Sequence, residues 1–284
     1  AYDSEQARGI AGAITAIMTG VSYSTSAEMA GFLGAFDKYK ENKKHMLRVM
    51  HNHRAAAYDA MDAYEGLEIK PQGINAKYCP DYLLKAATKA WDNAVQLGEK
   101  YGYRNAQTTV IAPTGTIGLV MDCDTTGIEP DIALVKYKQL AGGGMMKIVN
   151  RTVPLALKTL GYDSPEIDRI VKHIEDAETI EGAEDLKPDH ISVFDCAFKA
   201  NHGTRSIQWK AHIKMMAAAQ PFLSGAISKT VNMPSTATVE EVEEVYYQGW
   251  KQGLKALAIY RDNCKVGQPL SDAKSKEDSS STPN

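Results

Sequence analysis

The residue pattern of this 284-residue chain changes at Asn105. Before that point, apolar residues recur every three or four positions through long segments, which predicts packed helices. After it, short β-branched runs alternate with helical segments, and this alternation favours an α/β arrangement over a helical bundle. We therefore expect a helical part over 1–104 and a part of strands and helices over 105–270. The polar segment 271–284 has no apolar anchors and is predicted to be disordered.

Local signals define the expected elements. Ser4 is a candidate N-cap, and Gly20 is expected to end the first helix. Thr238 and Glu241 form a capping box before a late helix. The acidic segment 175–189 is expected to be a solvated connection or an insertion. Helices are expected at 4–20, 25–32, 41–64, 80–98, 145–160, 164–175, 209–219 and 238–250, and strands at 108–111, 226–233 and 254–259.

A short buried strand is predicted to end in a polar turn. Residues 108–111 are β-branched, and Pro113 stops the run because proline has a fixed φ and no N–H. The turn that follows, residues 113–117, is called the anion loop below. A motif as short as Pro-Thr-Gly-Thr recurs by chance, so an ordinary polar turn is the competing interpretation.

The residue types of the anion loop suit a phosphate. Glycine lets the backbone approach a ligand, so the N–H groups of Gly115, Thr116 and Ile117 are placed to converge on one anion. The hydroxyls of Thr114 and Thr116 add two donors. A helix beginning near Thr116 would strengthen the preference for phosphate through its free N–H groups and dipole.

Composition excludes several classes of protein. Lys and Arg number 32 against 35 Asp and Glu, a net charge of −3, whereas a nucleic-acid binder is expected to be basic. No apolar run approaches the roughly 20 residues of a membrane span, and the first residues do not resemble a secretory signal. We therefore expect a cytoplasmic protein without nucleic-acid or membrane partners.

The sequence does not indicate a metal site. Its four cysteines, at 79, 123, 196 and 264, form no Cys-x-x-Cys pair, and we expect reduced thiols. His51 and His53 are two positions apart and point to different faces of a helix, unlike a metal-binding pair four apart. A zinc enzyme has no spacing in its favour, and no metal ligands are assigned.

Several motifs resemble one known family. Ala112-Pro-Thr-Gly-Thr-Ile117, followed by Thr126-Gly-Ile-Glu-Pro130, resembles the substrate-diphosphate loop of the large subunit of ribonucleotide reductases. The similarity runs from about Tyr2 to about Leu270, with the motifs in the family's order. The segments that resemble the adenosylcobalamin-dependent (class II) branch are 134–144, 218–234 and 253–264.

The resemblance implies a fold, ligands and site residues. The fold would be the C-terminal portion of a ten-stranded α/β barrel with a helix-rich first half. The complete enzyme would bind adenosylcobalamin, reduce a ribonucleoside diphosphate by radical chemistry with electrons from a dithiol, and form an oligomer. Glu129, in the shared Gly-Ile-Glu-Pro motif, would shape the site or contact the substrate directly. The residues matching the family's diphosphate loop are Pro113, Thr114, Gly115, Thr116 and Ile117.

One departure from the family bears on activity. The family's radical loop needs Asn, Cys and Glu spaced two apart, and no Asn-x-Cys-x-Glu occurs here. No catalytic residue is assigned, and the chain is expected to be inactive without an N-terminal reductase polypeptide or domain carrying that loop. The chain is then either one half of a split reductase or an excised piece of a longer one. Ala258 and Ile259 stand where radical-importing class I enzymes carry a tyrosine pair.

A second interpretation belongs to another class of protein. A non-catalytic phosphate-binding or assembly module, whose helical first half docks a partner chain, would lack the radical loop equally well. The two interpretations differ in the partner that they require. A split reductase predicts a neighbouring polypeptide that carries Asn-x-Cys-x-Glu and a domain for a dinucleotide effector.

Overall fold

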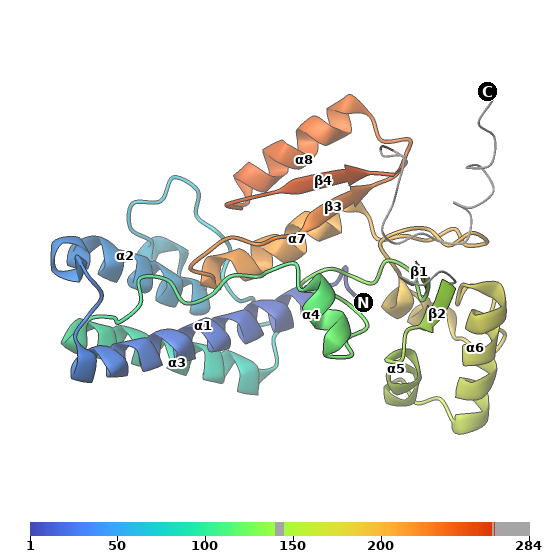
Figure 1. Cartoon of the computed structure of the whole chain (residues 1–284), viewed down its shortest axis with the longest axis horizontal. Coiled ribbons are helices and arrows are strands. Elements are labelled where there is room, and N and C mark those ends of the chain that lie inside the picture. Colours follow the sequence, from blue (N-terminus) through green and yellow to red (C-terminus); the bar gives the residue numbers. More distant parts are fainter. Residues whose placement is uncertain (140–144, 263, 265–284) are drawn as a thin grey trace.

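The computed structural model describes residues 1–139, 145–262 and 264. Figure 1 shows a helical layer at one end, a pair of parallel strands flanked by helices above it, and a smaller unit with a β-hairpin at the other end. The glycine run at 142–144 and the tail at 271–284 lie outside the described residues. Among the helices that the structure describes, none is long and apolar enough to span a membrane.

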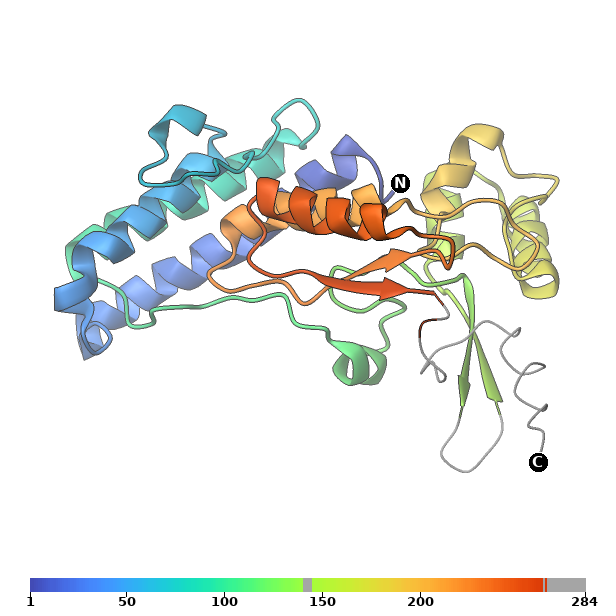
Figure 2. The same ribbon diagram turned by 90° about the horizontal axis from the view of Figure 1, so that it is seen from above.

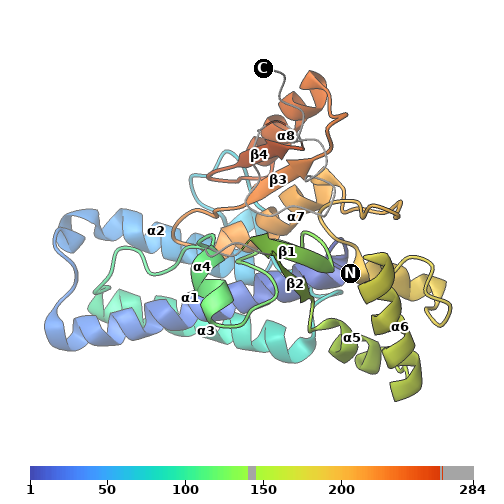
Figure 3. The same ribbon diagram turned by 45° about the vertical axis from the view of Figure 1, so that its right-hand side comes forward.

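The helical layer consists of three long helices, of which α1 and α3 lie side by side (Figures 1 and 3). Ser4 caps α1 as predicted, because its hydroxyl oxygen accepts a hydrogen bond from the Ala7 N–H at 3.1 Å. The core is aromatic, with the ring of Trp91 packed against Tyr23 and stacked on His53. The elements are α1 (Glu5–Leu33), α2 (Tyr39–Ala57), the 3-10 helix η1 (Met61–Ala63) and α3 (Asp81–Tyr101).

The break expected at Gly20 is wrong, because α1 is one continuous helix. Gly20 lies inside it, where an added Cβ would come within 2.9 Å of the Ala90 Cβ and 3.1 Å of the Ala90 carbonyl carbon on α3. The glycine therefore serves the close approach of two helices and does not mark a helix end.

Three extended segments pair in parallel above the helical layer. Residues 109–111 pair with residues 225–228, and the Ser228 N–H donates to the Ile111 carbonyl at 2.8 Å. The chain of 225–228 continues into β3, which pairs in parallel with β4. The elements of this parallel part are α7 (Trp209–Ala219), the 3-10 helix η3 (Gln220–Phe222), β3 (Thr230–Met233), α8 (Val239–Lys251) and β4 (Ala258–Arg261).

Two predictions for the parallel part have different outcomes. The capping box is confirmed, because Thr238 and Glu241 each accept a hydrogen bond from the other's backbone N–H. The late strand predicted at 254–259 is wrong in its first part, because β4 begins at Ala258. Leu254 and Leu257 instead pack in the core between α8 and the strands.

The hairpin unit, residues 131–205, is built around an antiparallel pair. β1 and β2 pair along their whole length and extend away from the rest of the chain (Figure 2). Asp163 caps α6 with a capping box to Glu166. The elements are β1 (Val135–Gln139), β2 (Met145–Val149), α5 (Val153–Thr159), α6 (Ser164–Ala177) and the 3-10 helix η2 (Pro188–Phe194).

Two expectations for the hairpin unit are corrected. The helix expected at 145–160 is wrong in its first part, because those residues form β2 by pairing with β1. The segment 175–189 is not simply solvated, since Ile180 and Leu186 are buried in one apolar cluster with Ile174 of α6. The boundary expected between 104 and 105 remains a prediction.

We expect Gly20→Ala to destabilise the fold by about 1–3 kcal/mol, because the added methyl group overpacks the contact between α1 and α3. Helix propensity alone predicts the opposite sign, a gain of up to about 1 kcal/mol. Gly31→Ala is the matched control, because Gly31 lies on the same helix and an added Cβ would meet only the ring of Tyr101, at 3.3 Å. The free energy of unfolding in urea, measured for both variants, decides between these two expectations. A Gly20→Ala variant as stable as Gly31→Ala would contradict the close packing of α1 against α3.

Candidate functional site

The anion loop follows the first of the three parallel segments. Figure 2 shows the extended chain that leads from α3 to α4 (Gly115–Val120). Thr114 has a φ of 48°, in the left-handed region, so the chain turns sharply just before α4 begins. The Gly118 N–H donates to the Thr114 carbonyl at 2.9 Å and closes the first turn of the helix.

Three adjacent donors lie in that first turn. The N–H groups of Gly115, Thr116 and Ile117 form no hydrogen bond within the described part of the chain, as is usual at a helix start. All three residues are exposed, and a Cβ added to Gly115 would meet no atom within 4 Å. The anion loop therefore presents unpaired donors to open space, where an anion has room to bind.

Gly127 packs against the back of the anion loop. Its φ is 56°, and an added Cβ would lie 2.8 Å from the Ala112 carbonyl oxygen and 3.4 Å from the Thr114 hydroxyl oxygen. The left-handed backbone and the close approach both require glycine. The Gly-Ile-Glu-Pro motif thus contacts the loop that the sequence associates with it.

Glu129 of that motif binds a buried lysine from the middle parallel segment. The Glu129 Oε2 lies 2.5 Å from the Lys229 Nζ, and its Oε1 accepts the Thr230 N–H at 2.8 Å. Lys229 also donates to the His212 Nδ1 at 2.7 Å and to the Thr230 carbonyl at 2.8 Å. All three ammonium protons therefore have acceptors. We call Glu129, Lys229, His212 and Thr230 the Lys229 network.

Burial determines the protonation of the Lys229 network. It lowers the pKa of Lys229, and the Glu129 carboxylate opposes that shift. Burial, assisted by the Lys229 ammonium, lowers the pKa of His212 to about 3, so this imidazole is neutral at pH 7. Its Nδ1 accepts from Lys229, which places the ring proton on Nε2. Tyr2 lies against the His212 ring and donates to the Ile128 carbonyl at 2.9 Å; burial and Glu129 raise the pKa of its hydroxyl.

Sequence reasoning missed Lys229 and His212. A signal for Lys229 was present, because it alternates with Ile227, Val231 and Met233 and so shares the buried face of the strand with them. His212 had no comparable signal, since a histidine on an apolar helix face is most often an ordinary core residue. Only the fold brings it to the lysine, because the two residues come from α7 and from the strand segment.

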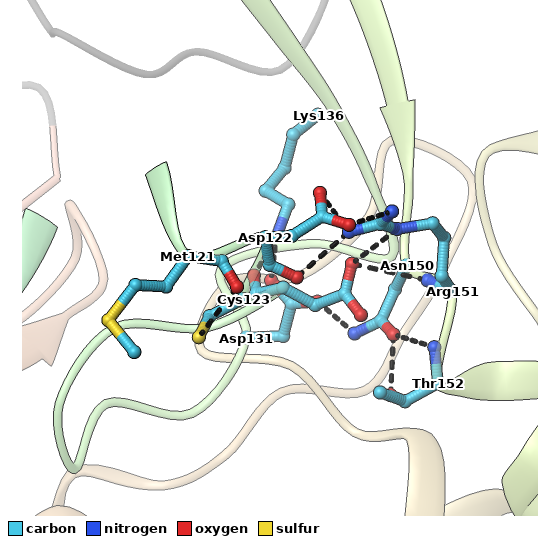
Figure 4. A network of polar contacts seen from close by, with 9 residues as sticks. Met121, Asp122, Cys123, Asp131, Lys136, Asn150, Arg151 and Thr152 are labelled. Atoms are coloured by element: carbon cyan, nitrogen blue, oxygen red, sulfur yellow. Dashed lines mark hydrogen bonds and ion pairs between the residues drawn. The ribbon is translucent and has the colours of Figure 1, made fainter. Parts of the chain in front are cut away.

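A second polar network holds the chain beyond α4 (Figure 4). Asp131 accepts hydrogen bonds from the Lys136 Nζ at 2.7 Å and from the Asn150 Nδ2 at 2.5 Å. Lys136 also donates to the Asp124 carbonyl at 2.7 Å. The return path from the anion loop is thus attached both to β1 and to the start of α5.

Neither a cluster of metal ligands nor either of the two best-defined pockets lies at the anion loop in the part of the chain that the structure describes. Among these residues, no group of three or more His, Cys, Asp or Glu could hold a metal ion. The two best-defined pockets have volumes of about 30 and 160 Å³, lie in the hairpin unit and include no residue of the anion loop in their walls. Pockets for small molecules usually measure about 300–1,000 Å³. The anion loop is an exposed turn that lines neither of these pockets.

Comparison with known proteins identifies the family. The family described as "Ribonucleotide reductase, barrel domain" matches residues 1–260. The chain belongs to this family. The match confirms the expected fold class, a portion of an α/β barrel with a helix-rich first half.

Curated relatives of this reductase family are much longer than the chain. The vitamin B12-dependent ribonucleotide reductase of Rhodopirellula baltica is 59% identical over 269 residues, which cover 95% of this chain and 24% of that protein. The protein of the same name from Streptantibioticus cattleyicolor is 56% identical over 278 residues, 98% of this chain and 43% of that protein. The vitamin B12-dependent ribonucleoside-diphosphate reductase of Mycobacterium tuberculosis is 34% identical over 173 residues. The chain thus spans less than half the length of these reductases.

We expect His212 to make the stability of the fold depend on pH. Its pKa is about 3 in the folded chain, against the ordinary value of 6.5, so the unfolded chain binds the extra proton between these values. Its contribution to stability is complete above about pH 6.5 and is lost as the pH falls toward 3, by up to about 1.4 kcal/mol per pH unit.

The test is the slope of unfolding free energy against pH between 6 and 4. His212→Asn keeps an oxygen acceptor for Lys229 but does not titrate, so its slope should be shallower. His45→Gln, at an exposed position of α2, is the control and should leave the slope unchanged. Equal slopes in the wild type and His212→Asn would refute the assignment of a buried, neutral ring.

Proposed function

We propose that this chain supplies the diphosphate-binding site of a cytoplasmic, adenosylcobalamin-dependent ribonucleoside-diphosphate reductase that makes deoxyribonucleotides for DNA synthesis. The observation that carries the proposal is the row of unpaired N–H groups at Gly115, Thr116 and Ile117. The family match and the names of the relatives supply the reaction class. All four cysteines are free thiols, which suits a reducing compartment.

A diphosphate suits these donors better than a neutral ligand does. The start of a helix favours negative charge, and a hydrogen bond to a charged group contributes about 1.5–3 kcal/mol. The hydroxyl of Thr116 is a further donor within the same turn, whereas that of Thr114 lies near Gly127 at the back of the loop, and Pro113 fixes the backbone that leads into the turn. Glu129 engages both carboxylate oxygens within the Lys229 network, so we assign it to shaping the site and not to binding the substrate.

The remaining chemistry is assigned to parts of the reductase beyond this chain. Adenosylcobalamin would supply the radical when bound in the complete enzyme, and we assign it no contacts to the described residues. We propose that an N-terminal reductase polypeptide or domain carries the radical loop. α1 offers a surface for such a partner, because Ile14, Met18 and Phe32 are 46%, 63% and 90% exposed on one side of the helix.

We expect ribonucleotide reduction only when this chain is mixed with a polypeptide that carries Asn-x-Cys-x-Glu, since neither part holds both the radical loop and the diphosphate site. The measurement is deoxyribonucleotide formation with adenosylcobalamin and a dithiol, for each polypeptide alone and for the mixture. Stable association without activity in the mixture would instead favour a non-catalytic assembly module. Comparing di- and triphosphates in the active mixture tests the choice of substrate.

We expect Gly115→Val to raise the KM for a ribonucleoside diphosphate about tenfold or more in the assembled reductase. The branched side chain would occupy the open space beside the unpaired N–H groups, and the loss of one charged hydrogen bond is worth at least a factor of ten. Gly118→Ala is the control, because its Cβ would meet only ordinary contacts at 3.6 and 3.8 Å. Equal KM values for the two variants would count against the anion loop as the diphosphate site.

A further inference from the structure

We propose that Lys229 is a positioning residue: through Glu129 it holds the Gly-Ile-Glu-Pro segment against the anion loop, and so sets the affinity of the site for a diphosphate. The inference rests on the proposed function of the anion loop. Lys229 lies 100 positions after Glu129 in the sequence and contacts the anion loop only through other residues.

Lys229 is not placed to bind substrate itself. Its side chain is completely buried. Its three ammonium protons are directed to the Glu129 carboxylate, the His212 ring and the Thr230 carbonyl, at 2.5, 2.7 and 2.8 Å. A phosphate would have to displace one of these acceptors from a site without access to solvent. Any effect of Lys229 on substrate must therefore pass through the residues it holds.

Glu129 is the residue through which the effect passes. One carboxylate oxygen binds Lys229 and the other accepts the Thr230 N–H, so the side chain spans two neighbouring residues of one strand. The N–H of Glu129 donates to the Thr126 carbonyl at 3.0 Å, which closes a turn within the segment, so Gly127 and Glu129 are held in one local structure. The segment cannot move away from the strand without breaking both bonds of the Glu129 carboxylate.

The segment in turn supports the anion loop. Gly127, two residues before Glu129, lies so close to the loop that an added Cβ would be 2.8 Å from the Ala112 carbonyl oxygen. Ala112 is the residue directly before the anion loop. A shift of Glu129 therefore alters the support behind the turn that displays the unpaired N–H groups.

Stability alone gives little reason for a lysine at this position. The strand neighbours on the buried face are Ile227, Val231 and Met233, so a methionine at 229 would continue an apolar face. Replacing a buried ion pair by apolar residues is often neutral or stabilising, whereas buried polar networks can specify one geometry. The lysine is better explained by the geometry that it imposes on Glu129.

The experiment uses the assembled reductase with Lys229→Met, Glu129→Gln and the double variant. We expect each single variant to raise the inhibition constant of inorganic pyrophosphate and the KM for a ribonucleoside diphosphate about tenfold, with a smaller fall in kcat. The double variant should be no worse than the worse single one, because both changes break the same connection. Effects that multiply in the double variant would overturn the proposal.

Controls separate positioning from loss of stability. Lys255→Met removes another lysine ammonium, one that donates to the carbonyls of Leu223, Ser224 and Gly225, and should leave pyrophosphate inhibition unchanged. Gly20→Ala provides a destabilised fold with an intact loop and should also leave it unchanged. If Lys229→Met does not fold, Glu129→Gln alone decides, since it exchanges one oxygen for an NH₂ group; an unchanged inhibition constant there overturns the proposal.

A parallel measurement on Gly115→Val separates a failure of the proposed function from a failure of the positioning role of Lys229. If Gly115→Val leaves pyrophosphate inhibition unchanged, the anion loop is not the diphosphate site and the proposed function fails. If Gly115→Val weakens inhibition while Lys229→Met and Glu129→Gln do not, the function stands and the positioning role of Lys229 fails.

Discussion

A buried ammonium group is tolerated only where acceptors replace the water that it has lost. Lys229 meets this condition with acceptors from three directions, and the requirement fixes a carboxylate, an imidazole tautomer and a strand backbone at one point. Lys136 repeats the arrangement on the other side of the return path, where it holds Asp131. Two largely buried lysines thus define the course of the chain that leaves the anion loop.

Much of the local structure was readable from the sequence, because it depends on neighbouring residues. The Ser4 cap, the Thr238 capping box and the helix through Trp91 all follow from spacing within one turn or along one face. The anion loop belongs to this class, since a proline, a glycine and two threonines determine its turn chemistry. Such signals do not require knowledge of what lies opposite in the fold.

The errors arose where a distant partner decides the conformation. Gly20 resembles a helix end until Ala90 is seen to lie against it. Residues 145–149 have helical spacing, but pairing with β1 makes them a strand. Residues 109–111 pair only with 225–228 in the described part of the chain, and Val110, the middle residue of the three, is 61% exposed. An open edge of this kind is consistent with a portion of an α/β barrel.

The parallel pairing at Ile111 also determines when the site exists during synthesis. Its partner, Ile227, emerges from the ribosome more than a hundred residues later, and closing so long a loop is a slow, late step in folding. Until then, the strand before the anion loop has no neighbour to pair with, and Glu129 cannot form its ion pair with Lys229. A nascent chain that already contains Pro-Thr-Gly-Thr therefore has the residues of the turn long before it has the strand pairing and the Lys229 network around them.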